Sequence, residues 1–506
     1  MEAVTRHRKR RRLVVVSNRL PFVISRAADG TLVSRPGSGG LVTALLPVLR
    51  DRGGVWVGWP GMADDEAEID AALTAATGKA GYQLAPVALS VQEQAGFYYG
   101  FSNEVLWPLF HDLQSLCNFD SGYWRSYCDV NRKYAQVVRA CAHADDFVWV
   151  HDYQLLLLGA ELRHAGFEAP LGFFLHIPFP PLDIYLKLPW RFTLLRALLD
   201  FDLIGFQTLR DQRNFTDCVR TLLPQARLTH RGQMVQLGER EVRVGSFPIG
   251  IDAAAFERQA RSGQVAAAAE ALRAEVHHRE LLLGVDRLDY TKGIPLRLEA
   301  FRTALRKYPQ LQERVTLIQV VVPSRDDIPQ YRDLKIRIEQ LVGEINGEFT
   351  RPGGWVPIHY VYRALDRLDL IAYYRAAQIA LVTPLKDGMN LVAKEFCASS
   401  VDGTGVLILS EFAGAAAQLQ HGALLVNPYD LDGTADAIHR AWQLPAAERR
   451  RRMSLLRRNV RRQDVFRWVN RFLEAAIARD LDAFPLPDDY LPSAEAEQAY
   501  WSTELD

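Results

Sequence analysis

The chain has 506 residues, of which 48% are hydrophobic and 24% charged. This composition is that of a folded globular protein and argues against a disordered one, and the length predicts two large domains rather than one. Lys plus Arg and Asp plus Glu both number 60. The resulting zero net charge argues against nucleic acid or an anionic membrane surface as the main partner.

The basic segment RHRKRRR (6–12) is a local exception to this balance. It could be a nucleic-acid arm, but a solvated leader before the first strand is the favoured interpretation. No apolar run approaches the roughly 18 residues that span a bilayer, and no apolar signal-peptide core follows the basic start. The five cysteines form no CxxC pair, which favours a reducing compartment and neither zinc nor disulfides. We therefore expect a cytoplasmic protein.

Buried strands are predicted wherever short β-branched or aromatic apolar runs recur without alternation, as in sheets covered on both faces. These runs lie at 13–18, 146–152, 171–178, 203–208, 280–288, 315–323, 357–362, 379–384 and 406–410. Helical patterns lie between or after them, for example at 211–223, 294–308 and 465–481. Strand and helix alternating over this length predict an α/β protein with two Rossmann-like, doubly wound parallel sheets that face each other across a cleft.

The domain boundary is predicted after SFPIGID (246–252), where an Ala-rich helical stretch precedes a fresh strand. The predicted domains are residues 1–250 and 251–470. Residues 471–506 form a helix and tail that would pack back on the first domain. Because ligands of open α/β sheets bind at the carboxyl ends of the strands, the turns after each strand are the places to look for function.

Two turns of the second half carry the most suggestive residues. GVDRLDYTKGIP (284–295) places Arg287 and Lys292 in one turn, and an Arg fork with a Lys point charge could clamp a diphosphate. In PLKDGMNLVAKEF (384–396), Gly388 permits close backbone approach and the following helix start offers free amides to an anion. Glu395 could bind the two hydroxyls of a ribose. The alternatives are a solvated loop for the cations and a surface salt bridge for Glu395.

The first half offers a comparable set at its strand ends. Arg19 follows the first strand, and RPGSGGL (35–41) ends in Gly39 and Gly40, which could equally be a plain turn. GFYYGFSNEVLWPLFH (96–111) suits sugar stacking or an apolar subcore. Asp152 and His176 each follow an apolar strand, and two such ends together favour function over a satisfied core histidine.

Twelve motifs occur in the order in which they stand in trehalose-6-phosphate synthases, and the resemblance covers residues 13–470, nearly the whole chain. They are VVVSNRLP, SGGL, GFSNEVLWPLFH, WVHDYQLLLL, FFLHIPFP, DLIGFQT, FPIGID, VDRLDYTKG, PSRDDIPQY, LVTPLKDGMNLVAKEF, LSEFAGAA and NPYD. The chain thus resembles retaining glycosyltransferases with two Rossmann-like domains, the glycosyltransferase-B fold. The resemblance implies an acceptor-binding N-terminal domain and a nucleotide-sugar-binding C-terminal domain.

The resemblance also implies roles for individual residues. Those implied to be catalytic are Arg287, Lys292, His176 and Asp387. Those implied to bind the donor are Gly39, Gly40, Arg287, Lys292, Leu365, Asp387, Gly388, Met389, Asn390, Leu391, Val392 and Glu395. Those implied to bind the acceptor are Arg19, Tyr98, Trp107, Asp152 and Arg325.

The implied reaction transfers glucose from UDP-glucose to glucose 6-phosphate with retention, giving trehalose 6-phosphate and UDP without a metal or other cofactor. GDP- or ADP-glucose remain open as donors, a homo-oligomer is open, and a separate phosphatase would act on the product. One alternative is a glucosylglycerol-phosphate synthase that uses glycerol 3-phosphate. The other is a catalytically silent sugar-phosphate sensor.

Overall fold

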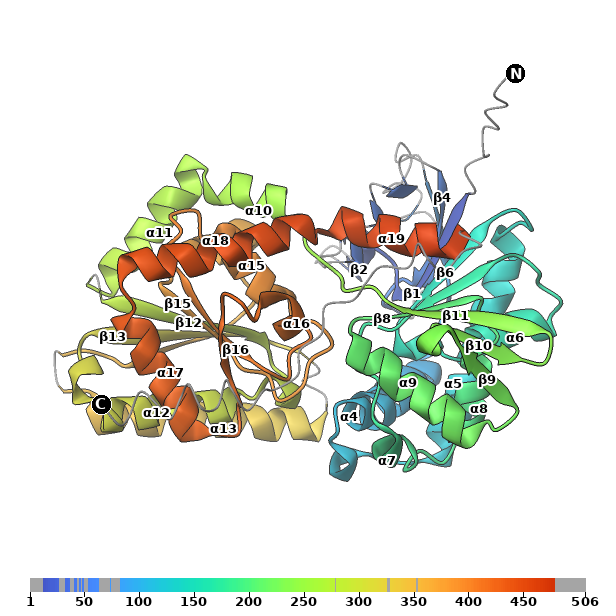
Figure 1. Cartoon of the computed structure of the whole chain (residues 1–506), viewed down its shortest axis with the longest axis horizontal. Coiled ribbons are helices and arrows are strands. Elements are labelled where there is room, and N and C mark those ends of the chain that lie inside the picture. The colour runs from blue at the N-terminus through green and yellow to red at the C-terminus, as the bar shows by residue number, and fades with distance from the viewer. Residues whose placement is uncertain are drawn as a thin grey trace, which may run out of the picture. The chain divides into compact units, whose positions relative to one another are not determined.

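Two separate sheets organise the chain (Figure 1). The computed structural model describes residues 12–26, 32–36, 41–42, 45–46, 48–49, 53–62, 73, 82–277, 279–324, 328–351 and 354–477. These residues fall into two compact units, each treated by itself below. The first holds the described residues up to Phe247 and those from Trp468 onwards, and the second is Pro248–Arg467. The sequence prediction placed the two crossings at residues 250 and 470.

The first unit is built on a nine-stranded sheet. In spatial order its strands are β5 (Gln83–Pro86), β4 (Gly54–Trp59), β1 (Leu13–Arg19), β6 (Phe147–His151), β7 (Leu171–Phe174), β8 (Leu203–Phe206), β11 (Arg240–Ser246), β10 (Met234–Leu237) and β9 (Ala226–Thr229). A separate hairpin joins β2 (Phe22–Arg26) to β3 (Leu32–Pro36). From β5 to β11 neighbouring strands pair in parallel, with the chain order reversing between β1 and β6.

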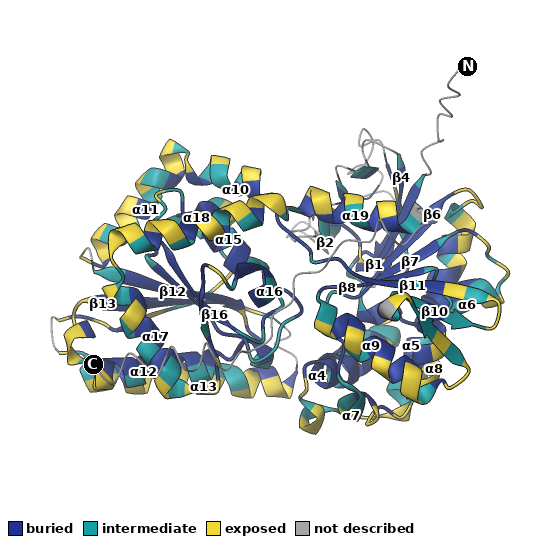
Figure 2. Ribbon diagram, viewed as in Figure 1, coloured by how far each residue is buried: buried dark blue, intermediate teal, exposed yellow. Residues whose placement is uncertain are grey.

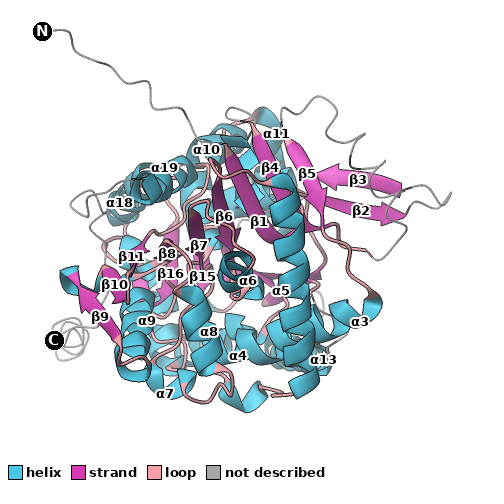
Figure 3. Cartoon of the chain, turned by 90° about the vertical axis from the view of Figure 1, so that its right-hand side faces the viewer, coloured by secondary structure: helices cyan, strands magenta, loops and turns pink. Residues whose placement is uncertain are grey.

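Helices cover this sheet on both faces (Figure 3). They are α3 (Val91–Glu93), η1 (Gln94–Leu106), α4 (Trp107–Phe110), η2 (Gln114–Leu116), α5 (Ser121–Cys141), η3 (Tyr153–Leu155), α6 (Leu158–His164), α7 (Leu182–Tyr185), α8 (Arg191–Leu198), α9 (Leu209–Leu222) and η4 (His230–Gly232). Helix α5 packs on β4 and β5, and α9 packs on β8 and β11. Among the helices with η labels, η1 is wound in the wider π form.

The second unit has a six-stranded sheet in which every pairing is parallel. The spatial order is β14 (Ile358–Tyr362), β13 (Val315–Val322), β12 (Glu280–Arg287), β15 (Ile379–Val382), β16 (Val406–Ser410) and β17 (Leu424–Val426). The chain order reverses between β12 and β15. In an open α/β sheet such a reversal leaves a crevice at the carboxyl edge, which is where ligands bind.

The helices of the second unit alternate with these strands. They are α10 (Ala253–Ala260), α11 (Gly263–Glu275), η5 (Tyr290–Lys292), α12 (Ile294–Lys307), η6 (Pro309–Leu311), α13 (Pro329–Phe349), α14 (Arg367–Ala376), α15 (Leu391–Ser399), α16 (Ala416–Leu419), α17 (Leu431–Gln443), α18 (Ala446–Arg462) and α19 (Val465–Ile477). Figure 2 shows the strands of both sheets buried and the helices exposed along their outer sides. Among the described residues, no helix combines the length and apolar character that crossing a membrane requires.

Helix α19 begins in the second unit and continues into the first. The Phe472 ring stacks on Trp149 of β6 with centroids 4.3 Å apart, and Arg243 donates to the carbonyl of Ala475 at 2.6 Å. The residues of this helix after Trp468 therefore belong to the core of the first unit. The predicted helix ran to residue 481, and residues 478–506 lie outside the described part of the chain.

The nine predicted strands are all present, and the five cysteines are all free thiols. One expectation needs correction, because the first sheet is not wholly parallel: β10 pairs antiparallel with both β9 and β11. Most residues of β9 and β10 are half-buried, so neither strand has the continuous buried apolar run that marks a strand covered on both faces. The strands that the sequence argument missed are β2, β3, β4, β5, β9, β10, β11 and β17.

Candidate active site

The crevice between β12 and β15 gathers the cations that the sequence pointed to. Arg287 is the exposed last residue of β12, and among the described residues its side chain has no hydrogen-bond partner. Lys292 ends the short helix η5 and is 9% exposed. Its ammonium lies 2.6 Å from Oδ2 of Asp387, which follows β15. The structure thus brings Lys292 and Asp387 together across the reversal point, beside the strand that ends at Arg287.

The turn that positions Lys292 is fixed by local chemistry. The Asp289 side chain accepts from the amide and the hydroxyl of Thr291, both at 2.9 Å, which caps η5. Gly293 then adopts a left-handed conformation with φ of 64°, and a Cβ there would lie 2.7 Å from the carbonyl oxygen of Thr383. Glycine is therefore required for the chain to turn from η5 into α12 this close to the end of β15.

A buried arginine, Arg297, stabilises the turn that carries Lys292. Arg297 of α12 is 1% exposed and donates to Oγ1 of Thr383 at 2.9 Å, to Oε1 of Gln319 at 3.2 Å and to the carbonyl of Lys292 at 3.2 Å. It also pairs with the carboxylate of Asp286. Sequence reasoning missed Arg297, because an arginine on an amphipathic helix is ordinarily solvated and only its distant partners reveal that it is buried.

Helix α15 begins beside the Lys292–Asp387 pair. Its N-cap, Asn390, has φ of 79°, accepts from the amide of Ala393 at 3.1 Å and donates to Oδ2 of Asp387 at 3.2 Å. The helix thus starts at Leu391. The amides of Leu391 and Val392 lie in its first turn, where the helix dipole is positive. Gly388 and Met389 of the preceding loop are buried.

Glu395 projects from the second turn of the same helix. Its Oε2 accepts a hydrogen bond from the Tyr374 hydroxyl of α14 at 2.8 Å. Burial raises the pKa of Glu395, and the hydrogen bond from Tyr374 opposes that rise. Glu395 thus has a neutral hydrogen-bond partner in Tyr374, whereas the alternative for this residue was a surface salt bridge. Leu365 is half-buried in the loop between β14 and α14.

In the first unit, Arg19 lies at the carboxyl end of β1 against aromatic rings. Its guanidinium carbon is 4.3 Å from the ring centroid of Trp59 and 5.7 Å from that of Tyr98. A Cβ on Gly61, whose φ is 99°, would come within 2.6 Å of the Arg19 guanidinium. The structure therefore unites two predicted acceptor residues, Arg19 and Tyr98, and adds Trp59, which the sequence argument did not single out.

Asp152 and His176, which follow the adjacent strands β6 and β7, also come together. Asp152 has φ of 76°, uncommon for a residue with a side chain, and its Oδ1 accepts from the amide of His176 at 3.2 Å. The His176 ring lies against His151, with Nδ1 of His151 3.2 Å from Nε2 of His176. Burial lowers the pKa of His176 to about 3 and holds the pKa of His151 well below its ordinary value, with the neighbouring His176 adding to the second shift.

The remaining predicted residues are less directly placed. Trp107 is 5% exposed and packs between His111 and Tyr153, with ring centroids 4.4 and 5.7 Å away. Trp107 therefore lies in the core and contacts Tyr153, the residue that follows Asp152. The last three, Gly39, Gly40 and Arg325, lie outside the described residues. Within the described ranges no cluster of three or more His, Cys, Asp or Glu side chains is suited to a metal ion.

The comparisons with known proteins agree on one family. The family model for glycosyltransferase family 20 matches residues 11–478. The trehalose-6-phosphate synthase of Mycolicibacterium gilvum is 44% identical over 476 residues, covering 92% of this chain and 94% of that protein.

Two solved structures are similarly close. An α,α-trehalose-phosphate synthase (UDP-forming) from Burkholderia xenovorans, in complex with glucose-6-phosphate, is 35% identical with a TM-score of 0.83, covering 92% of this chain and all of that one. A protein from E. coli bound with UDP-2-fluoro glucose is 36% identical with a TM-score of 0.82, covering 94% of this chain and all of that one. The chain therefore belongs to glycosyltransferase family 20, among its trehalose-6-phosphate synthases.

Proposed function

We propose that this chain transfers glucose from UDP-glucose to glucose 6-phosphate with retention of configuration, forming trehalose 6-phosphate and UDP. The observation that carries this proposal is the 44% identity to a trehalose-6-phosphate synthase over nearly the full length of both chains. The solved relatives with bound glucose-6-phosphate and UDP-2-fluoro glucose supply the two substrate classes. The relatives give no support to glycerol 3-phosphate as the acceptor or to a silent sensor.

The donor would bind at the β12–β15 crevice of the second unit. Arg287, which no described residue neutralises, would grip the diphosphate with its fork, and Lys292 would add a point charge. The first-turn amides of α15 would contribute the positive end of the helix dipole. Glu395 would bind the ribose hydroxyls, since Tyr374 holds one of its oxygens and leaves the other for the ligand.

The acceptor would bind at the carboxyl edge of β1, β6 and β7 in the first unit. The Arg19 guanidinium, stacked on Trp59 and beside Tyr98, would take the phosphate of glucose 6-phosphate. Asp152 would orient the acceptor sugar. His176, kept neutral by burial, would hydrogen-bond a hydroxyl of the transferred glucose.

Retention would follow from front-face attack. A double displacement needs a carboxylate nucleophile at the anomeric carbon. Asp387 is ill suited to that role, because Oδ2 is hydrogen-bonded to both Lys292 and Asn390. In the front-face scheme the bond from the anomeric carbon to the diphosphate oxygen breaks as the acceptor oxygen attacks, and that diphosphate oxygen takes the acceptor proton. Arg287, Lys292 and the amides would stabilise the charge that develops on UDP.

These residues would do the work that a divalent cation does at other nucleotide-sugar sites, so we propose a metal-independent reaction. Trehalose 6-phosphate keeps its phosphate, and a separate phosphatase would be needed to remove it. An assay with two alternative acceptors tests the proposed function. UDP release and product identity are measured with UDP-glucose plus either glucose 6-phosphate or glycerol 3-phosphate. Product formed only with glycerol 3-phosphate, or no UDP release with either acceptor, would contradict the proposal.

A further inference from the structure

Helix α18, far along the chain from the cations of the donor crevice, carries a large excess of positive charge. Its 17 residues include eight arginines and one acidic residue, Glu448. Glu448 pairs with Arg451 and Arg452 at 2.7 and 2.8 Å, and Arg449 pairs with Glu280 of β12. Three of the arginines therefore have a carboxylate partner, and the other five lie further around or along the helix.

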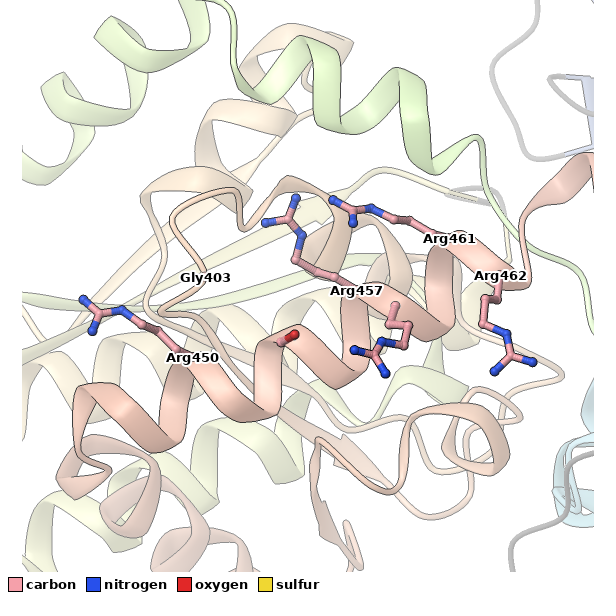
Figure 4. A pocket seen from close by; sticks show the side chains of 7 residues that line it. Gly403, Arg450, Arg457, Arg461 and Arg462 are labelled. Carbon is pink, nitrogen blue, oxygen red and sulfur yellow. The ribbon is translucent and has the colours of Figure 1, made fainter.

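These five arginines line one hollow of about 490 Å³ (Figure 4). They are Arg450, Arg457, Arg458, Arg461 and Arg462. Arg457 and Arg461 share the carboxylate of Glu257 in α10, at 2.8 and 2.7 Å. The others, Arg450, Arg458 and Arg462, are exposed and have no acidic partner among the described residues. Every unpaired arginine of α18 thus lines the same hollow.

Three of the five arginines form a row along the helix, and the other two, Arg458 and Arg462, lie on the flank of this row. At about 100° per residue, Arg450, Arg457 and Arg461 lie within about 40° of one another around the axis of α18, and the row is about 16 Å long. Figure 4 shows Arg457 and Arg461 extending to the same side of the helix and Arg462 to another side. A single phosphate could reach only part of this row, whereas an anion with several charged groups in line could contact most of it.

The hollow is separate from the proposed donor site. Arg457 donates to the carbonyl of Ser400 at 2.9 Å, immediately after the last residue of α15, and Gly403 of the following turn completes the lining. The donor loop lies at the other end of α15, and nine helical residues span about 13 Å. A ligand in the hollow would therefore leave the first-turn amides of α15 accessible.

We propose that this hollow binds a linear phosphate chain, as found in inorganic polyphosphate or in the triphosphate of a nucleotide. Arginine forks bind pairs of phosphate oxygens and stay charged at every physiological pH. Arg450 of the row and Arg458 and Arg462 on its flank are unpaired, so several phosphates lying in the hollow would bring negative charge to guanidinium groups that no described carboxylate neutralises. An ordinary solvated helix face would bind anions weakly and without regard to their length.

The test is calorimetric titration of the full chain with inorganic tripolyphosphate in the presence of saturating UDP and glucose 6-phosphate, because the proposed donor clamp and the proposed acceptor site at Arg19 also attract phosphates. We expect one remaining site, with orthophosphate bound at least tenfold more weakly than tripolyphosphate. The triple variant Arg450→Gln, Arg458→Gln, Arg462→Gln should lose at least tenfold in affinity. Its fold should persist, because these side chains have no acidic partners to lose. Equal affinities for ortho- and tripolyphosphate would overturn the proposal.

A matched variant separates the hollow from general charge. Arg125, Arg139 and Arg440 are exposed, and none has a side-chain hydrogen bond or ion pair within the described ranges. Changing these three to Gln removes the same charge and should leave tripolyphosphate binding unchanged. An equal loss in both variants would overturn the proposal.

Two further ligands identify what the hollow recognises. ATP binding as tightly as tripolyphosphate would mark the phosphate chain as the recognised part. Tighter ATP binding, lost in the same triple variant, would assign the hollow to a nucleotide. Both outcomes support the proposal. A duplex DNA oligonucleotide that binds α18 more tightly than either would overturn it in favour of a nucleic-acid surface.

Discussion

Arg287 and Lys292, paired in the sequence argument, lie in different electrostatic states. Lys292 is 9% exposed and already ion-paired with Asp387, whereas Arg287 is exposed at the end of its strand without a described partner. An arriving diphosphate therefore competes with Asp387 for the ammonium, but it meets the guanidinium unopposed. This contrast makes Arg287 the more informative of the two to change.

We expect Arg287→Ala to lower kcat by about 100-fold or more, the usual cost of removing one preorganised donor from developing charge. The melting temperature should stay near that of the parent, because no described contact is lost. Arg287→Lys should fall between the two, since an ammonium keeps the charge but not the fork. Steady-state UDP release measures all three. An alanine variant that keeps most of the parental kcat would remove Arg287 from the clamp.

The pair His151 and His176 predicts a pH dependence of stability. Both pKa values are lowered by burial, so the folded chain holds both rings neutral where the unfolded chain begins to take up protons, near pH 6.5. Stability from this pair is thus complete above pH 6.5 and is lost as the pH falls towards the folded-state pKa values. The loss is at most about 1.4 kcal/mol per pH unit for each histidine.

The double variant His151→Asn, His176→Asn removes both groups and should flatten the dependence. Urea unfolding of parent and variant between pH 8 and pH 5 measures the slope of the free energy of unfolding against pH. If the free energy of unfolding depends on pH in the same way in both proteins, the two histidines do not have lowered pKa values in the folded state.

At the scale of elements, the amino-acid pattern alone predicted most of what local sequence controls. Continuous apolar runs identified β1, β12 and β15, and the rule that ligands bind at strand ends led to Arg19, Arg287 and Gly388. Two missed site residues share one cause, which is that their roles depend on partners distant in the chain. The role of Arg297 is apparent only from its ion pair with Asp286, and that of Tyr374 only from its hydrogen bond to Glu395.

Helix η1 escaped prediction for a different reason. Its π winding bonds residue i to i+5, so the apolar positions of GFYYGFSNEVL do not repeat with the period of an α-helix, and they suggested only an aromatic cluster. The arginine run at 449–452 was visible in the sequence. What no pattern could show is which arginines of α18 find carboxylates, because Glu280 and Glu257 lie about 170 and 200 residues earlier in the chain than their partners.

Glycine-to-alanine changes in helix α13 would measure how much intrinsic helix propensity contributes to the stability of this protein. Gly343 and Gly347 are exposed within its 21 residues, and a Cβ at either position would meet nothing within 4 Å. The double change of Gly343 and Gly347 to Ala should therefore raise the free energy of unfolding by about 1 kcal/mol per site. Thermal unfolding should show an increase of about 2–4 °C per kcal/mol.

The matched control for α13 is Gly284→Ala on β12. A Cβ there would lie 2.3 Å from Oε1 of Gln319 and 2.8 Å from Nη1 of Arg297. This change should lower the melting temperature, because it intrudes on the buried Arg297 network. A stabilised Gly284→Ala variant would show that the hydrogen-bond network of Arg297 can rearrange around the added methyl group. A destabilised α13 variant would show that Gly343 and Gly347 have a role other than forming the helix.

At the scale of the whole molecule, the described part of the chain passes between its two units at 247/248 and again at 467/468. Within the second unit the two crossing segments are bonded together, since the amide of Val465 donates to the carbonyl of Ile251 at 3.1 Å. Gly250 lies at their closest approach. A Cβ there would come within 2.1 Å of the carbonyl oxygen of Gln463, a backbone atom that cannot rotate aside.

We expect Gly250→Ala to force these two segments apart. Overpacking against fixed atoms costs about 1–3 kcal/mol, so the melting temperature should fall by several degrees. Limited proteolysis should cut near residues 463–465 faster than in the parent, because separating the segments breaks the bond between Val465 and Ile251. Gly263→Ala, at a helix start with nothing within 4 Å of the added Cβ, should change neither measurement. If Gly250→Ala matches Gly263→Ala in both stability and cleavage pattern, the crossing is looser than its geometry indicates, and coupling between the units must be sought elsewhere in the chain.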